Sequence, residues 1–244
     1  MRKTVNILIV LLLNSIACNT GLFQKEDGAC IGIVFDISDD FRKAKEINRS
    51  HLKNLFESEG TVNASATCFI SYISHLRHTE IQEFRMPGST INGNILERQK
   101  LYDTLYARII EEIQRIHQSV GTDASYVAFA IAEMLQKVSA CKDCRSKKVI
   151  VFGDLGENTP IFSFYSKTDH QKILTAPQTV EELFDREYPL PKLDGIELVF
   201  INRTFTKNQD EAYHQAYLFF KKYYESHGAR VSISTSLTES TYGK

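Results

Sequence analysis

Strand-length apolar runs alternate with amphipathic helical segments along this chain, and this alternation restricts the possible folds more than any other feature. Residues 29–35 (ACIGIVF) form a continuous apolar run, which is typical of a central strand buried on both faces of a parallel sheet. Further core strands are predicted at 149–152, 196–202 and 230–234. Apolar residues at helical spacing predict helices at 41–59, 95–120, 124–138 and 210–227. This order predicts an α/β fold with a doubly wound, mostly parallel sheet and helices on both faces.

Two stretches of the chain have a less regular pattern. Two further strands are predicted at 66–76 and 81–86, around a polar turn, and Pro87-Gly88 ends this pair. Residues 155–194 carry the weakest pattern, with a short helix predicted at 180–186. The length suits one large domain, and no second long apolar segment follows the amino terminus.

The amino terminus has the pattern of an export signal. Arg2 and Lys3 precede an apolar run at 7–13, too short to cross a bilayer, which needs about 20 apolar residues. The next segment, Ser15-Ile16-Ala17-Cys18, resembles the lipobox of bacterial lipoproteins, in which the signal peptidase cuts before the cysteine. An ordinary secretory peptide cut near Ala17 is the alternative.

The lipobox resemblance implies a signal peptide at 1–17, a polar tether at 18–28 and a domain at 29–244. Cys18 would be the lipidated first residue, and the membrane-anchored domain would face the periplasm or the cell surface. Cleavage removes Arg2 and Lys3 and no acid, so the formal charge of −1 becomes −3. This charge gives no indication of nucleic-acid binding.

Four cysteines remain after Cys18, an even number that permits three pairings: Cys30, Cys68, Cys141 and Cys144. Cys141 and Cys144 form a C-x-x-C between a predicted helix and a predicted strand. No second such pair and no nearby His pair accompany it, so a zinc site is not expected. A short surface disulfide within this pair, or two idle thiols, is the expectation.

Polar segments follow the predicted strands where an open α/β sheet binds its ligands, beyond the carboxyl ends of the strands. Three segments are expected to meet at this edge: 36–40, 121–125 and 153–157. Their carboxylates and hydroxyls are hard oxygen ligands, which suit Mg²⁺, Mn²⁺ or Ca²⁺. Helix capping is the alternative role, by Ser38 or Asp40 for the first helix and by Thr122 or Asp123 for the helix at 124–138.

Three motifs in this order, VFDISDD, GTDAS and VIVFGDLGEN, resemble those of the von Willebrand factor A domain with its metal-ion-dependent adhesion site. They match an apolar strand ending in D-x-S-x-S, a G-T-D loop before a helix, and a strand ending in Asp. The resemblance covers 30–235 and implies that the strand at 81–86 is antiparallel. It also implies protein recognition through a divalent cation, which completes its coordination shell with a carboxylate of the partner.

The resemblance assigns the metal site to five residues: Asp36, Ser38, Asp40, Thr122 and Asp154. In the family, the hydroxyls touch the metal and the Asp residues act largely through bound water. Asp40 departs from the family, which has a second Ser there, and a third carboxylate favours Ca²⁺ over Mg²⁺. Glu157 and Asn158 are candidates for a further ligand or for the rim of the site.

The sequence therefore predicts a membrane-anchored protein-binding module and no enzyme. One alternative is a haloacid dehalogenase-like phosphohydrolase, because an apolar strand ending in Asp36 also resembles the nucleophile strand of that family. Ser38, however, stands where that family requires a second acid. Another alternative is a metal-free structural member of an envelope or conjugation complex. The glycine-rich phosphate-binding motifs G-x-x-x-x-G-K and G-x-G-x-x-G do not occur.

Overall fold

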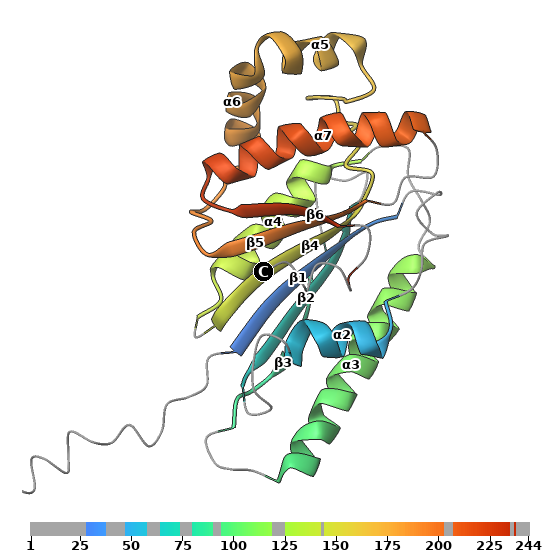
Figure 1. Cartoon of the computed structure of the whole chain (residues 1–244), viewed down its shortest axis with the longest axis vertical. Helices are drawn as coiled ribbons and strands as arrows, with labels where there is room; N and C mark the ends of the chain where they lie inside the picture. The colour runs from blue at the N-terminus through green and yellow to red at the C-terminus, as the bar shows by residue number, and fades with distance from the viewer. Residues whose placement is uncertain are drawn as a thin grey trace, which may run out of the picture.

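A computed structural model of the chain describes residues 28–37, 47–57, 64–73, 80–89, 94–118, 125–142, 144–202, 207–234 and 237. Its strands form one sheet in the order β3-β2-β1-β4-β5-β6 (Figure 1). The strands are β1 (Gly28–Asp36), β2 (Ala66–Ile73), β3 (Gln82–Met86), β4 (Cys144–Gly153), β5 (Ile196–Asn202) and β6 (Arg230–Ser234). Neighbouring strands are parallel except β2 and β3, which pair antiparallel. The expected mostly parallel sheet with one antiparallel edge strand is confirmed.

Strand β1 lies in the middle of the sheet, between β2 and β4, and all of its residues are buried. Its side chains alternate between the two cores: Ile33 and Phe35 face one side, and Cys30 and Val34 face the other. Because a central parallel strand is covered on both faces, its sequence is apolar throughout.

Helices cover both faces of the sheet. The described helices are α2 (Arg49–Glu57), α3 (Ile95–His117), α4 (Val127–Ser139), α5 (Lys167–Thr175), α6 (Pro177–Glu187) and α7 (Lys207–Ser226). Apolar residues of α2 and α3 belong to one core, and those of α4, α6 and α7 belong to the other. Figure 1 shows α5 and α6 beyond α7, away from the sheet. In the described part of the chain, no helix combines the length and the apolar character that a membrane crossing requires.

Two helices differ from the sequence-based expectation. Residues 47–48 are not helical, and α2 begins at Arg49, because the Asn48 side chain accepts a hydrogen bond from the backbone N–H of His51 at 3.1 Å. Residues 41–46 and 58–59 of the predicted helix lie outside the described residues. Helix α5 was not expected: Ser166 caps it through the N–H of Asp169, and none of its residues is buried. A helix without a buried face has no apolar period to reveal it.

A disulfide joins Cys30 near the start of β1 to Cys141 in the turn after α4, across 111 residues of sequence. Cys68 and Cys144 are not in a disulfide. The expectation of a short disulfide within Cys141-x-x-Cys144, or of two idle thiols, is therefore wrong for Cys141. Its partner comes from the neighbouring strand, which sequence spacing alone does not place beside it.

Candidate functional site

The order of the strands places a reversal point of the topology at the carboxyl ends of β1 and β4. Connections from these adjacent strands run to opposite sides of the sheet, and ligands of open α/β sheets bind at such a reversal point. Asp36 is the last residue of β1, Gly153 is the last residue of β4, and Asp154 follows at once. The topology thus brings two of the predicted site residues to neighbouring strand ends.

Gly153 allows Asp36 to lie directly against the end of β4. A Cβ atom at position 153 would lie 2.7 Å from the Asp36 Cβ and 3.2 Å from its Oδ2. Asp36 is only 4% exposed, so its side chain is buried beneath the edge of the sheet rather than on the surface. A larger residue at 153 would displace this carboxylate.

Asp154 is held within the loop that follows β4. Its Oδ1 accepts a hydrogen bond from the Gly156 N–H at 2.8 Å, and its Oδ2 accepts one from the Tyr165 hydroxyl at 3.3 Å. Leu155 between them has a left-handed φ of 59°, and its side chain is buried in the core. Tyr165 is 65% exposed, but desolvation of its hydroxyl where it meets the loop and the charges on Asp154 and Asp36 raise its pKa, so both carboxylates act on the same phenol.

The segment before α4 meets the loop after β4. Ser125 and Asn158 exchange two backbone hydrogen bonds, of 3.2 and 2.9 Å. The Ser163 hydroxyl donates to Asn158 Oδ1 at 3.0 Å, which fixes the Asn158 side chain within its own loop. Asn158 therefore serves as a link between loops.

Glu157 has a role that the sequence did not reveal. It was a candidate for a ligand or for the rim, but its side chain is fully buried and accepts a hydrogen bond from the Ala128 N–H at 2.7 Å. It caps the amino end of α4, where Tyr126 makes no side-chain cap. The Tyr188 hydroxyl also donates to it, at 3.4 Å. Burial raises the pKa of Glu157 to about 8, although these hydrogen bonds oppose the shift.

The predicted metal site is described only in part. Asp36 and Asp154 lie at the carboxyl ends of β1 and β4. Ser38, Asp40 and Thr122 lie outside the described residues, as does Cys18. The two described carboxylates are hard oxygen donors and fit Mg²⁺ or Ca²⁺, which take six or more oxygens, so further donors from 38–40 and 121–124 would be needed. Where the chain is described, three or more potential ligand atoms of His, Cys, Asp or Glu come together at the cysteines Cys30, Cys141 and Cys144.

No protein-family model and no curated protein sequence matches this chain. Among solved structures, it is similar to the D319A mutant of the PilB minor pilin from Streptococcus sanguinis, with a TM-score of 0.50 and 11% identity over 89% of this chain. It is also similar to the human COPII-coat protein Sec24c, with a TM-score of 0.41 and 10% identity over 88% of this chain. The chain spans 60% of the pilin chain and 31% of the Sec24c chain. The likeness to the pilin shows the fold alone: a von Willebrand factor A-like, mostly parallel sheet.

Proposed function

We propose that this chain is a protein-binding module of the von Willebrand factor A type, which uses a divalent cation at the carboxyl edge of its sheet. One observation carries the proposal: Asp36 ends β1, and Asp154 follows the end of the neighbouring strand β4, at the reversal point of the sheet. Gly153 leaves the room for Asp36 to lie against β4. An ion held there with an open coordination position would bind a carboxylate of the partner protein.

The residues at this edge have different roles in the proposed site. Asp36 and Asp154 would hold the ion together with the hydroxyls of Ser38 and Thr122, while Asp40 adds negative charge. The Tyr165 hydroxyl occupies the Asp154 oxygen Oδ2, so ion binding at that oxygen would compete with this hydrogen bond. Buried Asp36 lies beside the backbone of β4, a position that restricts the room for an ion and favours a defined geometry.

Ion binding should stabilise the folded protein. At a concentration of 100 times the dissociation constant, the ion should add about 2.7 kcal/mol to the free energy of unfolding. Asp36→Asn should abolish this gain, yet raise stability without metal, because it removes repulsion between Asp36 and Asp154. Tyr165→Phe should tighten ion binding, since the competing hydrogen bond is lost. Melting curves in Mg²⁺, Ca²⁺ and Mn²⁺ measure these changes.

Asp103→Asn is the matched control, because Asp103 is on α3, where it pairs with Arg49 of α2 and not with the two carboxylates of the proposed site. This variant should keep the full ion-dependent shift. If none of the three ions changes the wild-type melting temperature relative to metal-free protein, the ion site is wrong, and the module recognises its partner without metal.

We also propose that Cys18 carries a lipid and anchors the module on the outer side of a membrane. The proposal is supported by the short apolar run and the Ser15-Ile16-Ala17-Cys18 segment. Metabolic labelling with a clickable fatty acid should tag the wild type and leave Cys18→Ser unlabelled, with the variant lost from the membrane fraction. Equal labelling of both proteins, or a wild type that stays in the soluble fraction, would refute the anchor.

A further inference from the structure

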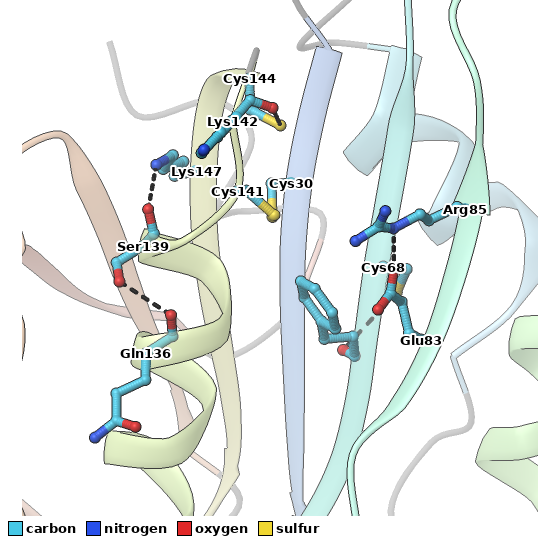
Figure 2. Close-up of a disulfide and its surroundings, with 11 residues drawn as sticks. Cys30, Cys68, Glu83, Arg85, Gln136, Ser139, Cys141, Lys142, Cys144 and Lys147 are labelled. Carbon is cyan, nitrogen blue, oxygen red and sulfur yellow. Dashed lines mark hydrogen bonds and ion pairs between the residues drawn. A yellow bond between two sulfur atoms is a disulfide. The ribbon is translucent and has the colours of Figure 1, made fainter.

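Three cysteines meet at the end of the sheet opposite the proposed ion site. The sulfur atoms of Cys30, Cys141 and Cys144 all lie within 4.8 Å of one another. Cys30 and Cys141 form the disulfide, and Cys144, the first residue of β4, keeps its thiol (Figure 2). A third sulfur therefore lies next to an existing disulfide, which is the arrangement that thiol–disulfide exchange requires.

The two sulfurs of the disulfide differ in access. Cys30 is 0% exposed within the core beside α4, whereas Cys141 is half-buried. Cys141 also lines a surface hollow of about 620 Å³, together with Ala140, Lys142 and Arg85. Cys144 lies within 4.8 Å of both sulfurs, and we assign the attack to the more exposed Cys141, with the buried Cys30 as the leaving sulfur.

Two lysines and their hydrogen bonds lie beside the cluster. Lys147 is the register partner of Cys30 on β4, and its Nζ donates to the carbonyl of Ser139 at 2.7 Å (Figure 2). Lys142 lies next to Cys144 in Figure 2, and the Cys144 thiol donates to the Lys142 carbonyl at 3.5 Å. The Lys147 contact holds the end of α4 against β4, and the Cys144 hydrogen bond holds its thiol beside the turn that carries Cys141.

We propose that Cys30, Cys141 and Cys144 form a thiol–disulfide exchange site. The Cys144 thiolate attacks Sγ of Cys141, a Cys141–Cys144 bond forms, and the Cys30–Cys141 bond breaks. The leaving sulfur of Cys30 takes up the proton that Cys144 lost, so no net oxidation or reduction occurs and no other reactant is needed. The product disulfide lies within the C-x-x-C, and Cys30 becomes a buried thiol.

Exchange moves a covalent link away from β1. In the described state, the disulfide ties the start of β1 to the turn after α4, and after exchange this tie is lost. Helix α4 connects the exchange site to the proposed ion edge, because it begins at the Glu157 contact and ends at Ser139 before Cys141. The exchange therefore changes the disulfide at one end of α4, and the other end of this helix contacts the loop that carries Asp154.

Disulfide mapping tests the proposal on the intact chain. Wild-type protein is held at about pH 8.5, where an ordinary thiol is half ionised, with a chelator present. It is then quenched and denatured in acid, labelled with N-ethylmaleimide, and mapped by mass spectrometry without reduction. We expect peptides joined through Cys141 and Cys144, with the label on Cys30. Their rate of formation should rise with pH, as the thiolate fraction rises.

Three variants give the proposal its controls. Cys144→Ser should keep the Cys30–Cys141 bond and show no label on Cys30. Cys30→Ser, which has no disulfide to exchange, should form the Cys141–Cys144 bond only when oxidised glutathione is added as the oxidant. Cys68→Ser should behave as the wild type, because Cys68 is buried in the core on the opposite face of the sheet. Absence of a Cys141–Cys144 bond in the wild type would overturn the proposal. The proposal would also be overturned if the reduced protein bound zinc stoichiometrically through the three sulfurs and the oxidised protein showed no exchange when a chelator is present.

Discussion

Glu157→Gln is expected to flatten the pH dependence of folding between about pH 5 and pH 8. In the folded protein the pKa of Glu157 is about 8, raised by burial from an ordinary value of 4.5. Between these two values the folded carboxyl holds its proton and the unfolded one does not. The contribution of Glu157 to stability is therefore fully present below pH 4.5 and is lost as pH rises toward 8, by about 1.4 kcal/mol of unfolding free energy per pH unit. Gln resembles the protonated side chain and does not titrate.

Urea unfolding at a series of pH values measures this difference. The two proteins should be about equally stable near pH 5, because Gln keeps an oxygen that accepts the Ala128 N–H. By pH 8 the variant should be the more stable by several kcal/mol. Glu181→Gln is the control, since Glu181 pairs with Lys222 away from this loop and should leave the wild-type slope unchanged. Parallel pH profiles for the wild type and Glu157→Gln would show that Glu157 is ionised in the fold.

The pKa of Asp169 shifts in the opposite direction to that of Glu157, and its effect on stability falls at a lower pH. Burial tends to raise its pKa, but the hydrogen bond and charge of Lys172 outweigh that effect and lower it below 3.8. A carboxyl with a lowered pKa stabilises the fold above its ordinary pKa, and this contribution is lost as pH falls through the folded value. The decline toward pH 8 and the decline in acid are therefore separate effects of different residues.

The strands were predicted well because each core strand is covered on both faces. The predicted strand at 196–202 coincides with β5 (Ile196–Asn202), which is such a strand. The predicted strand at 230–234 coincides with β6 (Arg230–Ser234), although β6 is an edge strand with exposed residues. Burial on two faces leaves a plain apolar signature that local sequence shows directly. The predicted helix at 180–186 was found as the longer α6 (Pro177–Glu187), because Val180 and Phe184 provide a buried side.

The candidate site was predictable only where it follows the strands. Asp36 and Asp154 were placed at one edge because parallel strands end at the same edge of a sheet. The roles of Glu157 and Tyr165 were not predictable, because they depend on contacts with α4 and Asp154 that cross the fold. A buried acid in a loop has the same local sequence as an exposed one, so only the structure separates a helix cap from a ligand.

The disulfide shows the same limit for cysteines. Cys141 lies close in sequence to Cys144, and local spacing therefore suggested that they would pair. The actual partner, Cys30, is 111 residues away and comes close because β1 pairs with β4 and α4 packs on both strands. Pairing of strands decides this bond, and a count of cysteines cannot reveal it.

Reduction of the Cys30–Cys141 disulfide is expected to lower the free energy of unfolding by about 5 kcal/mol. The bond closes a loop of 111 residues that contains β2, β3, α2 and α3, and it restricts the unfolded chain far more than the folded one. Chain-entropy estimates for loops of this length give about that value. Reduction leaves Cys30 as a buried thiol within the core beside α4.

The measurement is best made in Cys144→Ser, because this change prevents the bond from moving to Cys144. Urea unfolding near pH 6, with and without a phosphine reductant, gives the stability of each state. The double variant Cys30→Ala/Cys141→Ala should be insensitive to the reductant and about as stable as reduced Cys144→Ser, apart from the small cavity that the lost sulfurs leave. A reductant effect well under 1 kcal/mol in Cys144→Ser would mean that the unfolded chain keeps β1 close to the turn after α4 without the bond.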